Sequence, residues 1–199
     1  MIYINYIKQI IDYLFSLMAI IVLWPIFLLI TFIVYIDDPG NIIFTQKRIG
    51  KDKIPFNLYK FRTMKMLTPN DVPTHVLKNP ELYITRVGRV LRKTSLDELP
   101  QLFNILFGQM SFIGPRPALW NQYDLIKERD KYGVNSLKPG LSGWAQINGR
   151  DELPIKQKAM LDAEYLNNVS LIFDLRCVIG TIEAIITTRG QKEGGTGGV

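Results

Sequence analysis

Residues 13–36 read YLFSLMAIIVLWPIFLLITFIVYI and carry no charged side chain, with Asp12 before them and Asp37 after them. As an α-helix rising 1.5 Å per residue, the stretch would be about 36 Å long and could cross the ~30 Å hydrocarbon core of a bilayer. Pro25 lies in its middle, and proline kinks a helix because it lacks a backbone N–H. Each half would measure only roughly 18 Å. The stretch is therefore either a kinked span or a re-entrant hairpin whose ends lie on one face.

The basic residues around this stretch are placed unevenly. Lys8 precedes it, whereas four basic residues follow it closely: Lys47, Arg48, Lys51 and Lys53. Basic residues accumulate on the cytoplasmic side of membrane segments. We therefore expect the body of the protein to lie on the cytoplasmic face under either topology.

The composition excludes several classes of protein. The 199 residues are 47% hydrophobic, which excludes intrinsic disorder, and their net charge is +6. Cys177 is the only cysteine and His75 the only histidine, so disulfide scaffolds, thiolate metal cages, zinc sites and His-based triads are excluded. Any chemistry must use carboxylates, Lys, Arg, Tyr or hydroxyls. Without a nucleic-acid-binding motif, the basic excess beside an apolar stretch fits an anionic lipid surface rather than nucleic acid.

The rest of the chain predicts an α+β fold that is mostly helical. Residues 41–49 and 54–64 read as two strands around a turn at 50–53, and the proline-rich segment 65–80 reads as a loop. The segments 111–117 and 138–150, rich in glycine and proline, are expected to be loops too. Apolar periodicity predicts helices over 81–93, over 154–168, over 170–188, and around Leu99, Leu102, Phe103 and Leu106 with a stop at Gly108.

Two adjacent acids, Asp97 and Glu98, follow a basic cluster formed by Arg86, Arg89, Arg92 and Lys93. One interpretation is structural: Asp97 caps the next helix with Pro100 at its third position, or Ser95 and Glu98 form a capping box. The other interpretation is chemical. Two carboxylates among cations can hold Mg²⁺ against phosphate oxygens, or one can attack phosphorus directly. Spacing alone leaves both open.

Five motifs in order carry a resemblance to a known family: FTQKRIG (44–50), YKFRTM (59–64), SLDELPQLFN (95–104), MSFIGPRP (110–117) and KPGLSGWAQINGR (138–150). The chain resembles the small bacterial sugar transferases, the monotopic phosphoglycosyl transferases, from its apolar segment to about residue 189. The resemblance implies transfer of a sugar phosphate from a nucleoside diphosphate sugar, usually a UDP-sugar, to undecaprenyl phosphate. The products would be a polyprenyl diphosphate sugar and UMP.

The resemblance also implies an architecture. It favours the re-entrant reading: a monotopic membrane protein with a helix-break-helix at Pro25, amphipathic interfacial helices and a small β-hairpin. Trp24 stands where the family often has serine before that proline. The expected parts are a membrane helix over 1–38, a catalytic domain over 39–189 and a flexible tail over 190–199. The expected location is the bacterial inner membrane, with the active site on the cytoplasmic face.

Roles for single residues follow from the resemblance. Asp97 would be the nucleophile that forms a covalent phosphosugar intermediate in a ping-pong mechanism, and Glu98 would bind or orient Mg²⁺, with Asp97 as a further metal ligand. The phosphates and the nucleotide would contact Lys60, Arg62, Arg92, Arg116, Gln146 and Arg150.

Strand alternation would place Lys60 and Arg62 on one face. Trp144 reads either as a stacking partner for uracil or as a core or interface residue. The expected partners are a UDP-sugar, undecaprenyl phosphate and an anionic bilayer, with a homodimer also considered. A catalytically silent membrane scaffold of the same fold is the alternative, and the intact Asp97–Glu98 pair argues against it. The sugar and the glycan pathway stay open.

Overall fold

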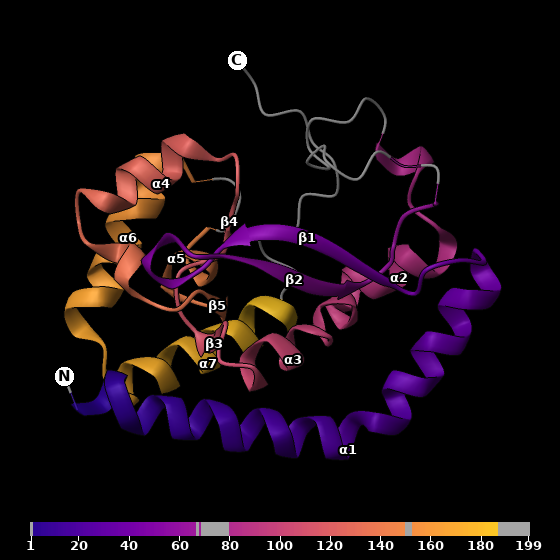
Figure 1. Cartoon of the computed structure of the whole chain (residues 1–199), viewed down its shortest axis with the longest axis horizontal. Helices are drawn as coiled ribbons and strands as arrows, with labels where there is room; N and C mark the ends of the chain where they lie inside the picture. The colour runs from indigo at the N-terminus through magenta and orange to yellow at the C-terminus, as the bar shows by residue number, and fades with distance from the viewer. Residues whose placement is uncertain (1, 67, 69–79, 150–152, 187–199) are drawn as a thin grey trace.

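The computed structural model describes residues 2–66, 68, 80–149 and 153–186. Figure 1 shows one long helix, α1, running beneath the rest of the molecule and then turning upward along one side. A twisted β-hairpin crosses above it, with the short helices α2 and α3 toward one end and α4, α5 and α6 toward the other. Arg150 and His75, like the predicted tail at 190–199, lie outside the described residues.

Helix α1 (Lys8–Asp37) follows a π-helical turn, η1 (Tyr3–Ile7). Together they form a helix long and apolar enough to cross a membrane, and only 11% of its most apolar 18-residue window is buried inside the molecule. The helix continues through Pro25 and changes direction in Figure 1, so the predicted break is a bend within one helix. Prolines produce such bends without ending a helix when the flanking residues keep helical geometry.

The predicted hairpin is confirmed. Strands β1 (Ile43–Ile49) and β2 (Pro55–Phe61) pair antiparallel, from Ile43 opposite Phe61 to Ile49 opposite Pro55. A 3₁₀ turn, η2 (Lys51–Lys53), joins them, and Asp52 and Lys53 adopt left-handed backbone angles there. Strand β4 (Ala118–Leu119) pairs with the other edge of β1.

The two glycine- and proline-rich segments contain a small parallel sheet that the sequence did not predict. Strand β3 (Ser111–Ile113) pairs with β5 (Gly140–Ser142), and these strands are too short to show alternation. The backbones approach so closely that a Cβ at Gly140 would collide with the backbone nitrogen of Gly114. A Cβ at Gly143 would collide with the Gly114 carbonyl oxygen. The glycines therefore let two loops pack against each other as strands.

The predicted helices form with shifted ends. Helix α2 (Arg86–Thr94) starts five residues later than expected, because Thr85 caps it by accepting a hydrogen bond from the Gly88 N–H at 2.9 Å. The helix around Leu102 is α3 (Gln101–Leu106), and the last two are α6 (Ile155–Asn168) and α7 (Leu171–Ile186). The other helical segments within the described residues are η4 (Pro80–Leu82), η5 (Leu96–Glu98), α4 (Tyr123–Asp130), η6 (Val134–Ser136) and α5 (Trp144–Ile147).

Helix α1 forms one wall of the protein core. Its buried residues Ile30 and Val34 pack with Phe61 of β2 and Leu91 of α2. Further toward its N-terminus, four half-buried residues of α1 cover a second cluster on β2, α3 and the following turn, which contains Phe56, Leu58, Leu102, Ile105 and Met110. A third cluster joins β3 to α6 and α7 through Ile113, Tyr165 and Cys177. Helix α1 and the body therefore share their hydrophobic core.

Polar contacts fasten both ends of α1 to the body. Near its start, the Lys8 ammonium and the Tyr3 hydroxyl both donate to Asp174 Oδ2 of α7 at 2.6 Å. At its end, Asp37 accepts a hydrogen bond from the Val87 N–H at the start of α2, at 3.1 Å. A carboxylate is favourable at that place because the first N–H groups of a helix have no partner within it.

Candidate active site

Asp97 is held in a short 3₁₀ turn between two helices. Ser95 adopts a left-handed conformation (φ 58°) that ends α2 and starts η5, which carries Leu96, Asp97 and Glu98. The whole Asp97 residue, backbone and side chain together, is 7% exposed. The capping interpretation is wrong, since α3 begins after Pro100 without a side-chain cap and Ser95 makes no cap to η5. The two acids are thus left with no role in capping a helix.

Lys60 is the cation placed between the two carboxylates. It lies one residue from the end of β2, and its Nζ is 2.7 Å from Glu98 Oε1 and 3.7 Å from Asp97 Oδ2. All three side chains are at most one-fifth exposed: 20% for Lys60, 11% for Asp97 and 15% for Glu98. The structure therefore brings together three residues that the family resemblance had assigned to one site.

The charge of Asp97 is balanced between burial and its cationic neighbours. Burial raises the pKa of Asp97 above its ordinary value, and the nearby Glu98 charge acts in the same direction. Lys60 is the largest opposing influence, followed by Arg92. The net pKa shift of Asp97 is upward. Its ionised form is thus poorly solvated, which favours reaction with an electrophile that neutralises the charge.

Arg92 reaches the site from the last turn of α2. Its Nε donates to the Thr63 hydroxyl at 2.8 Å. Thr63, two residues after the end of β2, therefore orients the guanidinium. Thr63 itself is buried, 7% exposed. This contact sets Arg92 in place as a cation near Asp97.

Arg62 has a different role from the one expected. Its guanidinium donates to the Asp38 carbonyl oxygen and lies 3.4 Å from Asp38 Oδ2, and the residue is 7% exposed. Strand β2 ends at Phe61, and the Arg62 N–H donates to the Ile42 carbonyl at 2.8 Å just beyond it. Arg62 contacts the segment after α1, and its ion pair is with Asp38 rather than with either acid of the site.

Two other arginines donate hydrogen bonds to the backbone of the Arg116-Pro117 segment. The Arg116 carbonyl accepts from Arg129 Nη1 at 2.9 Å, and the Pro117 carbonyl accepts from Arg48 Nη1 at 2.9 Å. Arg129 is itself locked by Asp162, whose Oδ2 accepts from it at 2.6 and 2.8 Å. The backbone that carries the Arg116 side chain is therefore rigid.

Gln146 and Trp144 lie in α5, the short helix that follows strand β5 of the small parallel sheet. Gln146 is buried, and its Nε2 donates to the Leu141 carbonyl at 3.0 Å. Trp144 meets Phe173 edge-on at 5.0 Å between ring centroids, and the Arg176 guanidinium lies 5.0 Å from its ring. These contacts make Trp144 a packing residue, which agrees with the core alternative.

Asn104 is a positioning residue that the sequence analysis missed. It is fully buried, its Oδ1 accepts from the Tyr59 N–H at 3.0 Å, and its Nδ2 donates to the Asn57 carbonyl at 2.8 Å. These bonds attach β2 to α3 and hence place Lys60 beside Asp97. The signal for it is an amide among the apolar residues of the α3 sequence, QLFNIL.

The donor set at the site suits a hard cation shared with substrate. Among the described residues no group of three or more His, Cys, Asp or Glu side chains could hold a metal by itself. Two neighbouring carboxylates provide the kind of partial site that Mg²⁺ uses, because this ion takes one or two carboxylates together with phosphate oxygens and water. Asp97 and Glu98 therefore fit a magnesium ion that arrives with a diphosphate.

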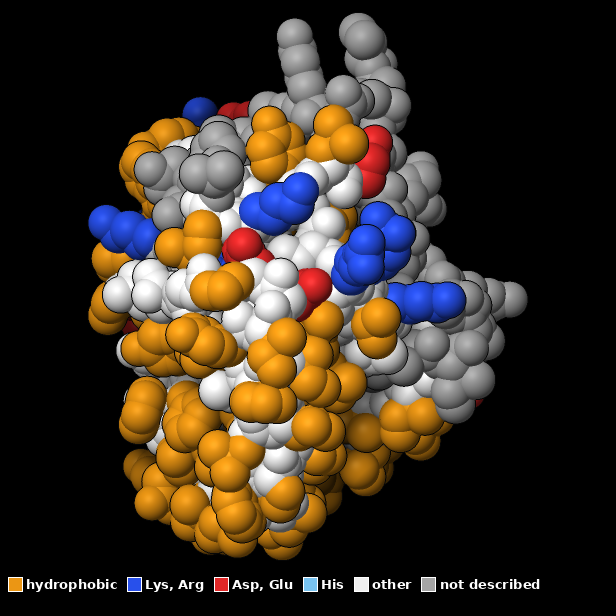
Figure 2. All heavy atoms as spheres, turned by 90° about the vertical axis from the view of Figure 1, so that its right-hand side faces the viewer, with side chains coloured by type: hydrophobic (Ala, Val, Ile, Leu, Met, Phe, Trp, Pro, Cys, Tyr) orange, Lys and Arg blue, Asp and Glu red, His pale blue; other side chains and the backbone are white. Residues whose placement is uncertain are grey.

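The site lies next to the apolar surface of α1. Leu96 and Leu99, on either side of the acid pair, pack into the cluster that contains Ile30 and Val34 of α1. Figure 2 shows the corresponding side of the molecule, where hydrophobic side chains cover the lower part and charged side chains of both signs gather above them. The acid pair is thus close to the border between apolar and charged surface.

Comparison with known proteins identifies relatives along nearly the whole chain. The family model described as bacterial sugar transferase matches residues 3–188. The exopolysaccharide production protein ExoY of Sinorhizobium fredii is 37% identical over 198 residues, which cover 92% of this chain and 87% of the relative. The UDP-glucose:undecaprenyl-phosphate glucose-1-phosphate transferase of Escherichia coli is 38% identical over 86% of this chain and 38% of its own length.

A third relative carries a different sugar in its name. The UDP-N-acetylgalactosamine-undecaprenyl-phosphate N-acetylgalactosaminephosphotransferase of Aeromonas hydrophila is 36% identical over 94% of this chain and 45% of its own length. The match to the family model and the extent of these alignments agree with the resemblance carried by the five motifs. The chain belongs to the bacterial sugar transferase family, and it is an enzyme.

Proposed function

We propose that the protein transfers a sugar 1-phosphate from a UDP-sugar to undecaprenyl phosphate, releasing UMP. The observation that carries this proposal is the buried arrangement of Lys60 with Asp97 and Glu98 beside the apolar surface of α1. Relatives named as undecaprenyl-phosphate sugar-phosphate transferases support the reaction class. Their names differ in the sugar, so the sugar of this enzyme is left to experiment.

In the first half-reaction Asp97 is the nucleophile. One of its carboxylate oxygens bonds to the phosphorus that carries the sugar, and the bond from that phosphorus to the bridging diphosphate oxygen breaks. UMP leaves with the bonding electrons, and the sugar phosphate stays on Asp97 as an acyl phosphate. Lys60 and Arg92 stabilise the negative charge that spreads over the phosphoryl oxygens.

In the second half-reaction the acceptor displaces Asp97 from the sugar phosphate. A phosphate oxygen of undecaprenyl phosphate bonds to the same phosphorus, and the bond to Asp97 breaks, which restores the carboxylate. Each half exchanges one P–O bond for another, so neither needs an external oxidant or a net proton transfer. Asp97 and Glu98 would hold Mg²⁺, which supplies positive charge to the diphosphate of the donor.

The membrane arrangement completes the proposal. The proline bend in α1 and its apolar, largely exposed surface support a re-entrant helix in the bacterial inner membrane. Lys60 and the acid pair would then lie at the cytoplasmic interface, where the water-soluble UDP-sugar and the lipid-linked phosphate can both reach Asp97. An aqueous donor and a membrane acceptor need a site at such a border.

The decisive experiment omits the acceptor. The purified protein with Mg²⁺ and a panel of UDP-sugars, including UDP-glucose and UDP-N-acetylgalactosamine, should release one equivalent of UMP per enzyme and gain the mass of one sugar phosphate. Asp97→Asn should do neither, whereas Asp124→Asn, an exposed acid of α4, should behave as wild type. UMP release that requires undecaprenyl phosphate would instead establish direct transfer and overturn the covalent intermediate.

A further inference from the structure

Two adjoining hollows lie at the N-terminal end of α1, away from the acid pair. The first is a small cavity of about 30 Å³ lined by charged and apolar residues of α1, the η2 turn, the start of β3 and the segment around Lys138. The second is a larger groove of about 330 Å³ between α1 and the end of α3. Gln9, Asp12 and Lys138 line both, so these three residues form the junction between the hollows.

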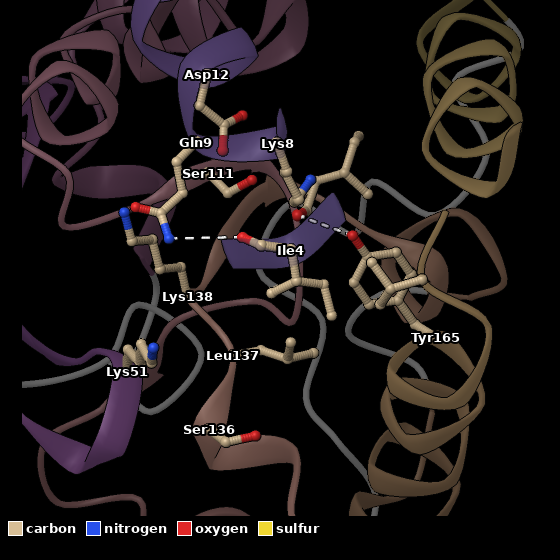
Figure 3. Close-up of a pocket in the computed structure, with 12 residues that line it drawn as sticks. Ile4, Lys8, Gln9, Asp12, Lys51, Ser111, Ser136, Leu137, Lys138 and Tyr165 are labelled. Atoms are coloured by element: carbon tan, nitrogen blue, oxygen red, sulfur yellow. Dashed lines mark hydrogen bonds between the residues drawn. The ribbon is translucent and has the colours of Figure 1, made fainter. Parts of the chain in front are cut away.

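The small cavity contains more cations than anions. Figure 3 shows the side chains of Lys8, Lys51 and Lys138 around it, together with Asp12 and Ser111. Lys8 is neutralised by its ion pair with Asp174 at 2.6 Å. Asp12 is the one acidic side chain in the lining, and its Oδ1 accepts from the Phe112 N–H at 3.1 Å.

Lys51 and Lys138 are the unpaired cations of this cavity. Within the described part of the chain, neither amine forms a hydrogen bond or an ion pair. Lys138 is half-buried, and burial lowers the pKa of its ammonium, while the nearby Asp12 charge opposes that shift. Lys51 and Lys138 thus outnumber the single Asp12 carboxylate among the described side chains that have no ion-pair partner in this cavity, so the cavity suits an anionic ligand.

The groove beyond the junction is apolar and opens toward the lipid-facing surface. Its walls are mostly hydrocarbon, from Ile10, Tyr13, Leu14, Ile105, Leu106 and Met110. Ile10, Tyr13 and Leu14 are each more than half exposed on α1. Its volume of about 330 Å³ falls at the lower end of the ~300–1,000 Å³ range of small-molecule sites. A chain of methylene groups is the ligand chemistry that such a groove favours.

We propose that these two hollows together bind one anionic glycerophospholipid of the bilayer, with its phosphodiester against Lys138 and Lys51 and one acyl chain in the groove. A phosphodiester lipid such as phosphatidylglycerol supplies both the anionic group that the two lysines favour and the acyl chain that the groove favours.

The place of this site separates it from the reaction. Lys51 is at the turn of the hairpin and Lys60 near its other end, and the five residue-to-residue steps from Pro55 to Lys60 alone extend about 17 Å. A phosphate held at Lys138 is therefore out of reach of Asp97. The lipid would anchor the start of α1 to the body, and this role stands whether or not the proposed reaction is correct.

Native mass spectrometry of the full-length protein in detergent with equal amounts of phosphatidylglycerol and phosphatidylcholine tests the proposal. The wild-type protein should retain one phosphatidylglycerol in preference to phosphatidylcholine. Lys138→Gln should weaken the apparent affinity about tenfold, because it removes a charge-assisted contact. Lys156→Gln, at an exposed lysine of α6, should retain the lipid as wild type does.

The hydrocarbon half of the site has its own pair of variants. Ile10→Trp should fill the groove and reduce lipid retention, whereas Ile21→Trp, at a similarly exposed position of α1 outside the groove, should not. Equal retention of the two lipids, or unchanged retention by Lys138→Gln, would overturn the proposal. Displacement of phosphatidylglycerol by a lower concentration of undecaprenyl phosphate would reassign the site to the acceptor, and displacement by millimolar inorganic phosphate would show that no acyl chain is recognised.

Discussion

Burial disfavours the ionised form of Asp97, and the neighbouring cations partly offset this effect. Burial and the Glu98 charge raise its pKa, while Lys60 and Arg92 lower it without cancelling the rise. A water-exposed carboxylate would be a stable anion and a poor nucleophile toward a diphosphate. The same burial that costs stability therefore makes the residue useful, a trade that is common at active sites.

Asp97→Asn should remove activity and stabilise the fold. We expect turnover to fall by more than about a thousandfold and the melting temperature at pH 7 to rise by a few degrees. Because the folded-state pKa of Asp97 is raised, its penalty is absent below the pKa of the unfolded state and fully present above the folded pKa. The gain in thermal stability should therefore shrink as the pH falls toward 4, which melting curves at several pH values can measure. A loss of stability at pH 7 would contradict this account of Asp97.

The acid limb of the activity profile should report Asp97. Since the pKa of Asp97 is raised, kcat/KM should begin to fall at a pH above ~3.9, the ordinary value for aspartate, as the solution is acidified. Lys60→Met removes the largest opposing charge and should move this limb to higher pH. Arg92→Met should move it in the same direction but less far, and Lys53→Met, at the hairpin turn, should leave it in place. An unmoved limb in Lys60→Met would assign the titration to another group.

At the scale of elements, one carboxylate of α7 joins the N-terminal helical segment to α6 and α7. Asp174 of α7 accepts hydrogen bonds at 2.6 Å from Tyr3 and Lys8 of the N-terminal helical segment and from Tyr165 of α6. Burial and the Asp174 charge raise the pKa of the Tyr165 hydroxyl, so this group stays protonated and remains a donor. Three elements thus depend on a single side chain.

Asp174→Asn should destabilise the protein by about 3 kcal/mol, because it leaves the Lys8 ammonium without its buried partner. Denaturant unfolding in detergent measures this change, with Asp124→Asn as the matched exposed control. The double variant Lys8→Met/Asp174→Asn should recover part of the loss, since it removes the unpaired charge as well. A double variant no more stable than Asp174→Asn would show that the tyrosine hydrogen bonds carry the whole effect.

The parallel pairing of β3 with β5 makes a second prediction at this scale. Gly140→Ala should destabilise by at least about 2 kcal/mol, because its Cβ would collide with backbone atoms of Gly114 and Ser142 that cannot move independently. Gly133→Asn is the control: Gly133 has φ +73°, which asparagine tolerates, and a Cβ there meets its nearest neighbour at 3.9 Å. Equal stability of the two variants, by the same denaturant unfolding, would refute the close packing of these strands.

The elements also show how far the sequence could be read. The hairpin, α6, α7 and the long apolar helix α1 follow from alternation, periodicity and an uncharged run, and all four form. The β3–β5 pair and the hydrogen bonds to the Arg116-Pro117 backbone join residues far apart in the chain. Three-residue strands and single arginines give no local signal for such contacts. The ion pair of Arg62 with Asp38 joins residues 24 positions apart, and no local pattern indicates it.

For the candidate site, the family motifs identified the residues and tertiary structure supplied their relations. Asp97, Glu98 and Lys60 were expected at one site, but nothing local indicates that Asn104 ties β2 to α3 and so sets their distances. The choice between a helix cap and a catalytic acid could not be made from spacing, since both use the same residue types. The structure shows no side-chain cap on η5 or α3, which argues against the cap and leaves the catalytic role of Asp97 as a proposal.

At the scale of the whole molecule, the distribution of apolar surface predicts the topology. Exposed hydrophobic side chains line most of α1, and its proline bend favours a return to the starting face. With Cys177→Ser as background, a cysteine at Ile2, which is 72% exposed, should react with a membrane-impermeant thiol reagent only after the cells are permeabilised. Labelling of intact cells would establish a span and refute the re-entrant helix.

The shared core of α1 and the body has a consequence for biogenesis. The N-terminal turn packs through Ile4 against a cluster that contains Cys177, some 170 residues later in the chain. At 5–20 residues per second, a ribosome needs roughly 10–30 s to make that partner. With α1 in the bilayer as proposed, insertion would precede folding during this interval, and the body would assemble onto a helix already in place. A nascent chain that misses the membrane would expose this helix to water and become a substrate for chaperones and proteases.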